Sequence, residues 1–418
     1  MEAKLIETII RGSLWVTYFL SLYFAVFWFL VYYAKLNHQE RKKELKIFGK
    51  VTIAIPAYNE EDSIEITAKS ACSLDYPNLE VIVVDDGSKD NTAKIVKKLM
   101  KKYSNLSLIQ QSNRGKGAAL NNALDNATGE YFVVFDADSE IKKDALRKML
   151  PYFSNKNVAV VLPVLKVRRP KNYLQKMQWF EYLINMFFKE LMSKLNCVHV
   201  APGPFSVYRT SILRKVGKFD EDNLTEDLEM AFRLQKHDYR LIQLLDVDVT
   251  TIAPENVKQL YKQRNRWYKG AILNAWNYKS MFFNKKYGDF SFIQMPTVIL
   301  SGIIALVMIF SIIYFAFKPY IIFFHNMYFV DFDFITVIKN LTFNIHILDY
   351  NFAVLAIGVA MFVVSLFIIK KSHVYTREKV FRHGFWSIFV YMNFYFLLLG
   401  TMWIGIAVDL VRRKKQKW

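Results

Sequence analysis

Four long stretches without a charged residue constrain this chain more than any other feature. The first, 14–34, reads LWVTYFLSLYFAVFWFLVYYA, and comparable runs occupy 292–317, 352–369 and 384–408. A helix of about 20 apolar residues can cross the hydrocarbon core of a bilayer, which is about 30 Å thick. We therefore predict four membrane-spanning helices, one before and three after a domain without spans.

The first run is predicted to be a membrane anchor rather than a cleaved signal peptide. It is longer than the apolar core of a signal peptide, and no small-x-small cleavage pattern follows it. The chain is 53% hydrophobic and carries a formal net charge of +19. So apolar a composition excludes a disordered chain. Because the basic residues lie outside the apolar runs, we expect contact with the lipid bilayer and no nucleic-acid partner.

Lysine and arginine near the spans predict the orientation of the chain. Only Lys4 and Arg11 precede the first span, whereas six basic residues follow it: Lys35, Arg41, Lys42, Lys43, Lys46 and Lys50. Cytoplasmic flanks of membrane spans are enriched in Lys and Arg. We therefore expect a multi-pass protein of the cell (plasma) membrane whose inserted domain is cytoplasmic.

The C-terminal tail conflicts with this topology. Three spans after a cytoplasmic domain would place the tail outside, against the charge rule. The tail holds five basic residues: Arg412, Arg413, Lys414, Lys415 and Lys417. A fourth or re-entrant element within 320–348 would remove the conflict, but polar residues such as Lys339 make that segment a poor membrane crossing. The sequence leaves the side of the tail and the number of spans open.

The inserted domain has the pattern of an α/β fold. Short β-branched runs at 51–55, 79–84, 106–110, 131–135 and 158–162 alternate with helical patterns. Their nearly continuous apolar character suits a parallel sheet that is buried on both faces. Helices are predicted from Asp90 to Tyr103 and, with an amphipathic period, at 173–195 and 255–278. In such sheets ligands bind beyond the carboxyl ends of the strands.

Two cysteines, Cys72 and Cys197, fall within the inserted domain. They are far apart in the sequence, and no CxxC spacing indicates a metal site. Because cytoplasmic thiols are kept reduced, we expect two free cysteines.

Acidic residues follow three of the predicted strands. The segments are PAYNE at 56–60, DDGS at 85–88 and DAD at 136–138. Each alone is compatible with an ordinary turn, but three clusters at strand ends converge on one edge of one sheet. Asp136 and Asp138 face the same side in extended backbone. Their hard oxygen ligands suit Mg²⁺ or Mn²⁺ holding a diphosphate.

Three further motifs carry functional side chains. NRGKG at 113–117 is not a Walker loop, but it offers a cation and flexible backbone near a helix start, which suits a phosphate. TED at 225–227 opens a helix, so helix capping by Thr225 or Asp227 competes with a functional role. QRNRW at 263–267 places Gln263, Arg266 and Trp267 on one helical patch. The helix that contains it is predicted to lie at the membrane surface.

In this order the motifs resemble those of family 2 glycosyltransferases with a GT-A fold. The resemblance covers about 50–280 and rests on PAYNE, VDDGSKDNT, NRGKG, FDADS, TEDLEM and QRNRW. It points to the membrane-embedded processive branch of cellulose, chitin, hyaluronan and poly-N-acetylglucosamine synthases. One span before the domain and three after it is similar to the bacterial poly-N-acetylglucosamine synthases. The resemblance implies a Rossmann-like domain with a mostly parallel sheet.

The resemblance also implies roles for single residues. Those implied to bind the nucleotide are Pro56, Tyr58, Glu60, Asp86, Lys116 and Asp136. Asp138, with Asp136 beside it, is the implied metal ligand, and Asp227 is the implied catalytic base. Contacts to the diphosphate or the acceptor are implied for Gln263, Arg264, Arg266, Trp267, Glu226, Gly203 and Pro204. The acceptor-side loop reads APGPFSVYR where the bacterial poly-N-acetylglucosamine synthases tend toward SGVF, which leaves the sugar open.

The expected organisation follows the order of the chain. After an N-terminal segment (1–13) and the first span (14–34), we place the GT-A domain at 50–254 and the interfacial helix with the QxxRW motif at 255–290. The remaining spans are 292–317, 352–369 and 384–408, and a basic tail follows at 409–418.

Three functions fit the sequence. The first is an inverting, processive transfer from a UDP-sugar, GlcNAc-type favoured, to a growing β-linked polysaccharide that is passed outward. The second is a single transfer of sugar onto a membrane lipid, such as a polyprenyl phosphate or a ceramide. The third is a non-enzymatic protein, either a basic membrane receptor or a nucleic-acid binder. Four spans are few for lining a channel that a polymer could pass through. If the first function holds, we therefore expect the protein to form a homo-oligomer or to bind a small membrane subunit.

Overall fold

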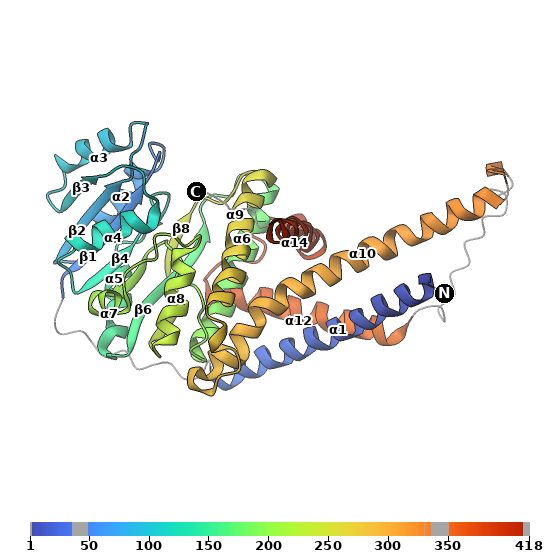
Figure 1. Cartoon of the computed structure of the whole chain (residues 1–418). Helices are drawn as coiled ribbons and strands as arrows, with labels where there is room; N and C mark the ends of the chain where they lie inside the picture. The colour runs from blue at the N-terminus through green and yellow to red at the C-terminus, as the bar shows by residue number, and fades with distance from the viewer. Residues whose placement is uncertain (1, 36–48, 330, 336–350, 413–418) are drawn as a thin grey trace.

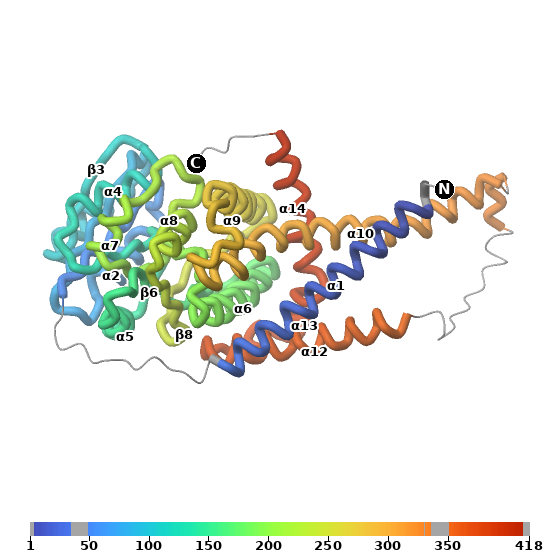
Figure 2. The backbone as a smooth tube through the Cα atoms, turned by 60° about the horizontal axis from the view of Figure 1, so that its bottom comes forward, coloured from blue at the N-terminus to red at the C-terminus, as the bar shows by residue number. Residues whose placement is uncertain are grey.

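In the computed structural model the chain forms an α/β domain from which long helices extend (Figure 1). The structure describes residues 2–35, 49–329, 331–335 and 351–412. The helices α1 (Glu2–Lys35), α10 (Met295–Phe329) and α12 (Phe352–Tyr375) run side by side away from the domain in both views (Figures 1 and 2). The α/β domain lies between α1 and α10 in the sequence and occupies one end of the molecule.

One eight-stranded sheet forms the centre of the domain. Its spatial order is β3-β2-β1-β4-β7-β6-β8-β5. The strands are β1 (Val51–Ala57), β2 (Leu79–Asp85), β3 (Leu106–Gln110), β4 (Tyr131–Val134), β5 (Glu140–Ile141), β6 (Val158–Val167), β7 (Ser206–Arg209) and β8 (Arg240–Thr251). Only β7 and β5 run antiparallel to their neighbours. The prediction of a mostly parallel, Rossmann-like sheet is confirmed.

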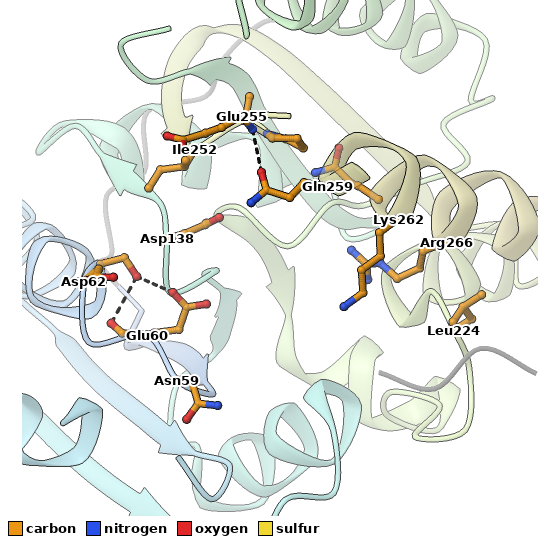
Figure 3. A pocket seen from close by; sticks show the side chains of 14 residues that line it. Asn59, Glu60, Asp62, Asp138, Leu224, Ile252, Glu255, Gln259, Lys262 and Arg266 are labelled. Carbon is orange, nitrogen blue, oxygen red and sulfur yellow. Dashed lines mark hydrogen bonds between the residues drawn. The ribbon is translucent and has the colours of Figure 1, made fainter. Parts of the chain in front are cut away.

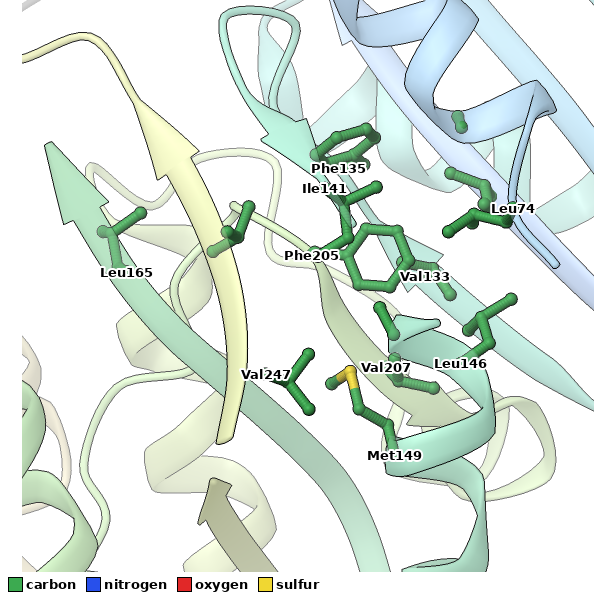
Figure 4. Packing of buried hydrophobic residues seen from close by; sticks show 14 of the residues in the cluster. Leu74, Val133, Phe135, Ile141, Leu146, Met149, Leu165, Phe205, Val207 and Val247 are labelled. Atoms are coloured by element: carbon green, nitrogen blue, oxygen red, sulfur yellow. The ribbon is translucent and has the colours of Figure 1, made fainter. Parts of the chain in front are cut away.

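Both faces of the sheet are covered by helices because the strand side chains are buried on both sides. Ile53 and Ile55 of β1 join one apolar cluster, whereas Ala54 joins another. The helices over the first face are α2 (Ile64–Cys72), α3 (Thr92–Met100), α5 (Ala145–Met149) and α6 (Tyr173–Lys194). Those over the second are α4 (Lys116–Asn126), α7 (Thr210–Val216) and α8 (Glu226–Lys236). Figure 4 shows part of the first cluster, where Phe135 and Phe205 lie among aliphatic side chains.

Within the described residues, four helices are long and apolar enough to cross a membrane: 4–34, 290–329, 352–375 and 385–411. They coincide with the four predicted runs. The last comprises α13 (Phe385–Val390), a π-helical turn (Tyr391–Tyr395) and α14 (Phe396–Val411). The helix containing the second run continues to Phe329, so the first part of the suspected re-entrant segment is helical. Residues 336–350 and the basic residues beyond Arg412 lie outside the described residues.

Several local predictions need adjustment. The helix expected from Asp90 begins at Thr92, because the Asp90 carboxylate accepts hydrogen bonds from the backbone N–H groups of Thr92 and Glu61, both at 3.0 Å. The strands β5, β7 and β8 were not predicted. The amphipathic helices at 173–195 and 255–278 are confirmed as α6 and α9 (Val257–Asn277). Cys72 and Cys197 are both free.

Candidate active site

Three neighbouring parallel strands end at the same edge of the sheet and deliver the acidic motifs there. β2, β1 and β4 are adjacent and parallel, so the segments after them meet. Asn59 joins the first two loops, since its backbone N–H donates to Ser88 Oγ at 2.9 Å and its side chain accepts from Lys89 N–H at 2.9 Å. Asn59 has φ 54°, a left-handed conformation that asparagine tolerates well. The predicted convergence of the acidic clusters is therefore observed.

A cavity of about 560 Å³ opens at this edge, between the sheet and α9. It is lined by Asn59, Glu60, Asp62, Ser63, Asp138, Leu224, Ile252, Ala253, Pro254, Glu255, Gln259, Lys262, Gln263 and Arg266. Figure 3 shows acidic Glu60, Asp62 and Asp138 on one side and basic Lys262 and Arg266 on the other. A ligand with a cation near the acidic wall and anionic groups near the basic wall matches this distribution of charge.

Lys116 lies between two predicted site residues. It is at the start of α4, and its Nζ lies 2.7 Å from Asp136 Oδ1 and 3.1 Å from Glu226 Oε1. Burial disfavours the ammonium, but the carboxylates around it outweigh this effect and raise the pKa of Lys116 above its ordinary value. Lys116 therefore stays protonated and ties the loop after β4 to the start of α8.

Asp227 lies in the first turn of α8, one residue after Glu226. Its Oδ1 accepts a hydrogen bond from Leu228 N–H at 2.8 Å. Neither Thr225 nor Asp227 caps the helix in the expected way, because the N-cap Thr225 makes no side-chain cap hydrogen bond and Asp227 lies inside the helix. Burial, and next the charge of Glu226, raise the pKa of Asp227 to about 6, while Lys116 and Arg266 oppose the rise. A carboxylate with a pKa near 6 is a stronger base than an ordinary aspartate.

The DxD pair has the properties expected of metal ligands. Asp138 accepts hydrogen bonds from Ser139 Oγ at 2.9 Å and Thr251 Oγ1 at 3.1 Å. Burial and the neighbouring charge of Asp136 raise the pKa of Asp138, and burial also raises that of Glu60. Asp136, Asp138 and Glu60 are half-buried. Among the described residues no group of three or more His, Cys, Asp or Glu is arranged to hold a metal ion.

Asp86 organises the NRGKG loop. It is buried, and its carboxylate accepts hydrogen bonds from the backbone N–H groups of Arg114 at 2.9 Å and Gly115 at 2.8 Å and from Gln111 Nε2 at 2.8 Å. Of the other residues implied to bind the nucleotide, Tyr58 is exposed and Pro56 is half-buried at the end of β1. None of these three residues lines the cavity.

The QxxRW helix divides its polar residues between two environments. Gln263 and Arg266 line the cavity. Arg264 is completely buried and pairs with Glu181 of α6, while its guanidinium lies 4.3 Å from the centroid of the Trp267 ring. The structure thus places Gln263 and Arg266 in the wall of the cavity, and Arg264 in the packing between α9 and α6.

Gly203 permits the position of Asp136. A Cβ atom at residue 203 would overlap the Asp136 carboxylate. Pro204 follows, and the loop returns to the sheet at β7. The APGPF loop is therefore part of the wall around the DxD pair, next to the Lys116 bridge.

Some lining residues were not identified from the sequence. Gln259 and Lys262 line the cavity together with Gln263 and Arg266. The four residues are spaced i, i+3, i+4 and i+7, which places them on one face of α9. The helical spacing alone therefore contained the signal that Gln259 and Lys262 share the face of the QxxRW motif.

Comparisons with known proteins support the fold of the α/β domain. Residues 52–217 match the profile described as "Glycosyl transferase family 2". A poly-β-1,6-N-acetyl-D-glucosamine synthase of Staphylococcus epidermidis is 29% identical over 262 residues, which cover 60% of this chain and 64% of that protein. The corresponding Staphylococcus aureus synthase is 31% identical over 223 residues, covering 53% of this chain and 54% of that protein. This chain thus matches less than two thirds of the length of either relative.

One solved structure supports the fold over nearly the whole chain. A mannosyltransferase from Pyrobaculum calidifontis, in complex with GDP-Man and Mn²⁺, superposes with a TM-score of 0.60 and 19% identity and covers 98% of each chain. At this identity the likeness concerns the fold. It extends the agreement from the α/β domain to the long helices.

Proposed function

We propose that this protein is a membrane-embedded, inverting glycosyltransferase that extends a β-linked polysaccharide from a UDP-sugar, with UDP-N-acetylglucosamine as the favoured donor. The match of residues 52–217 to the glycosyltransferase family 2 profile supports this reaction class. The observation that carries the proposal is the cavity with Glu60, Asp62 and Asp138 on one wall and Lys262 and Arg266 on the other. A diphosphate with a divalent cation is complementary to both walls. The names of the staphylococcal relatives support N-acetylglucosamine as the sugar and a polymer as the product.

The donor binds with its diphosphate between the DxD loop and α9. Asp138, with Asp136 beside it, would hold Mg²⁺ or Mn²⁺, which would supply positive charge beside the leaving diphosphate. Arg266 reaches the diphosphate from the opposite wall of the cavity. Lys116 adds a second fixed positive charge next to Asp136. The nucleoside lies along the loops after β1 and β2, near Tyr58, Glu60 and Asp86.

Asp227 acts as the general base. As the acceptor hydroxyl oxygen bonds to the anomeric carbon, its proton passes to the Asp227 carboxylate. The bond from the anomeric carbon to the diphosphate oxygen breaks, and UDP leaves with that electron pair. One displacement of this kind inverts the anomeric centre, so an α-linked donor gives a β-linked product. Trp267, next to Arg266, supplies an aromatic surface for the acceptor sugar.

A product analysis tests the proposal. The purified full-length chain in lipid nanodiscs is incubated with UDP-[¹⁴C]GlcNAc, UDP-glucose, UDP-glucuronate or GDP-mannose and with Mg²⁺ or Mn²⁺. We expect aqueous, high-molecular-weight product from UDP-GlcNAc and none from Asp227→Asn. Label only in the organic phase, as monoglycosylated lipid, would refute the polymer, and no transfer from any donor would refute the enzyme.

The proposal includes the surroundings of the site. We place the α/β domain in the cytoplasm, where nucleotide sugars are made, and the apolar helices in the cell membrane. Secretion of a polymer through so few helices needs a second copy of this chain or a small membrane subunit. Cross-linking in membranes, followed by mass spectrometry, identifies either partner.

A further inference from the structure

The last apolar helix, 385–411, lies across the other three long helices. We call it the C-terminal helix. In Figure 1 its α14 part is seen along its axis, whereas α1, α10 and α12 extend away from the domain. In Figure 2 α14 runs across α10. Each of these four helices is long and apolar enough to cross a membrane. Which of them cross it must therefore be inferred from how they are placed relative to the α/β domain.

The chain returns to the α/β domain before the C-terminal helix begins. Lys166 Nζ of β6 donates to the backbone oxygen of Thr376 at 2.7 Å and pairs with Glu378 at 3.1 Å. The His383 ring then packs edge-on against Trp179 of α6, with 4.6 Å between the ring centroids. The segment between α12 and α13 is therefore fastened to the surface of the domain.

The C-terminal helix remains attached to the domain along its length. Tyr395 OH donates to Glu181 of α6 at 2.7 Å, and the Trp403 ring stacks on Tyr268 of α9 at 4.6 Å. Further along, Asn265 Nδ2 of α9 donates to Asp409 at 3.0 Å. From residue 395 to residue 409 a helix advances about 21 Å. A helix that crossed the bilayer away from the domain would lose such contacts within a turn or two.

The crossing with α10 lies near the domain end of that helix. Trp403 packs on Gly302, where a Cβ atom would stand only 2.7 Å from the indole ring, and Gly400 packs on Ile309. Beyond this crossing α10 continues from Phe310 to Phe329. These twenty residues are about 30 Å long, which matches the hydrocarbon core of a bilayer. This segment lies further along the chain than most of the predicted run 292–317, and it contains Lys318, which pairs with Glu7 of α1 at 2.6 Å. Ionisable groups inside a membrane are paired with one another in this way, so the part of α10 beyond the crossing is long enough for a span in which the Lys318–Glu7 pair faces α1.

The C-terminal helix exposes aromatic side chains away from its contacts with the domain. The exposed residues are Phe385, Trp386, Phe389, Phe394 and Phe396. Trp and other aromatic side chains are enriched at the boundary between headgroups and acyl chains. The helix is followed by the exposed Arg412, a residue that favours a surface with anionic lipid.

We propose that the C-terminal helix lies in the plane of the bilayer, at the surface nearest the α/β domain, and does not cross it. The proposal rests on the membrane location stated above. It leaves α1, α10 and α12 as the crossing helices, and it keeps Arg412 on the same side as the domain. The predicted conflict between three C-terminal spans and a basic tail then disappears. The partner of the exposed aromatic face is the lipid headgroup region.

Cysteine labelling tests on which side the end of the helix lies. Three single-cysteine variants are made in a Cys72→Ala background: Arg412→Cys, Lys97→Cys on α3, and Tyr328→Cys at the far end of α10. Cells that express each variant are treated with a membrane-impermeant maleimide before and after permeabilisation. We expect Arg412→Cys to react like Lys97→Cys and opposite to Tyr328→Cys. Reaction of Arg412→Cys like Tyr328→Cys would overturn the proposal. If the two reference sites react alike, the membrane location itself is wrong. Sugar transfer is not needed for this measurement.

Depth measurements test the orientation of the helix independently. Nitroxides at Phe396→Cys and Val408→Cys, both exposed, are about 18 Å apart along the axis. Because the two sites point about 120° apart around the helix, we expect shallow depths that differ by less than the helix diameter of about 10 Å, measured from their collisions with oxygen and a nickel chelate in nanodiscs. The matched pair Leu355→Cys and Leu366→Cys on α12, about 17 Å apart, should differ in depth. A depth difference for the first pair as large as that of the α12 pair would overturn the proposal.

Discussion

The acid limb of the pH–rate profile should depend on Glu226, the neighbour of the proposed base. Burial and then the Glu226 charge raise the pKa of Asp227 from 3.8 to about 6. The base works only when ionised, so activity falls as the pH falls through 6. At pH 5 about one tenth of Asp227 is ionised, which reduces kcat/KM about tenfold. Other charged groups that act on Asp227 lie on α4, α9, the DxD loop and α6: Lys116, Arg266, Asp136 and Lys189.

Replacing Glu226 by Gln tests this account. The substitution removes a like charge and should lower the acid limb by about 0.3 to 1 pH unit, since burial accounts for the larger part of the total shift of about two units. The assay is kcat/KM for UDP-GlcNAc from pH 4.5 to 8, because this ratio reports the free enzyme. Melting temperatures across the same range show whether the chain stays folded. Three results would refute the reasoning. They are an acid limb near pH 4 in the wild type, an acid limb that Glu226→Gln leaves unchanged, and sugar transfer by Asp227→Asn.

Three more predictions follow from single contacts. Gly203→Ala should displace the Asp136 carboxylate and, because a misplaced group near the reacting atoms is costly, raise the donor KM by about tenfold or more. Gly358→Ala, where the added Cβ has open space around it, should leave the donor KM unchanged. Equal donor KM values for the two variants would contradict this prediction. Arg264→Met leaves the Glu181 carboxylate with the Tyr395 hydrogen bond but without its cationic partner. This change should destabilise the fold by roughly 3–5 kcal/mol in denaturation, and a stability equal to the wild type would disprove that the pair matters. EDTA should abolish transfer, with recovery on adding Mn²⁺ or Mg²⁺, and full activity in EDTA would exclude the metal.

The amino-acid sequence alone identified the features that depend on near neighbours. The four apolar runs appear as helices that are longer than the runs themselves, because the length and hydropathy of a single segment determine whether it can span a bilayer. The acidic motifs meet at one edge because the strands before them are parallel neighbours. Asp138, Gln263 and Arg266 were therefore expected at one site, and all three line the cavity.

The tertiary structure decided what the motifs do next to one another. Arg264 and Arg266 stand two residues apart in one motif, yet one is buried against Glu181 and the other lines the cavity. Two residues turn the helix by about 200°, so the rotation of α9 against α6 selects which of them meets the ligand. The same holds for the C-terminal helix. Its composition permits a span, and only its contacts with α6 and α9 place it across the others, because a packing partner far away in the sequence fixes its direction.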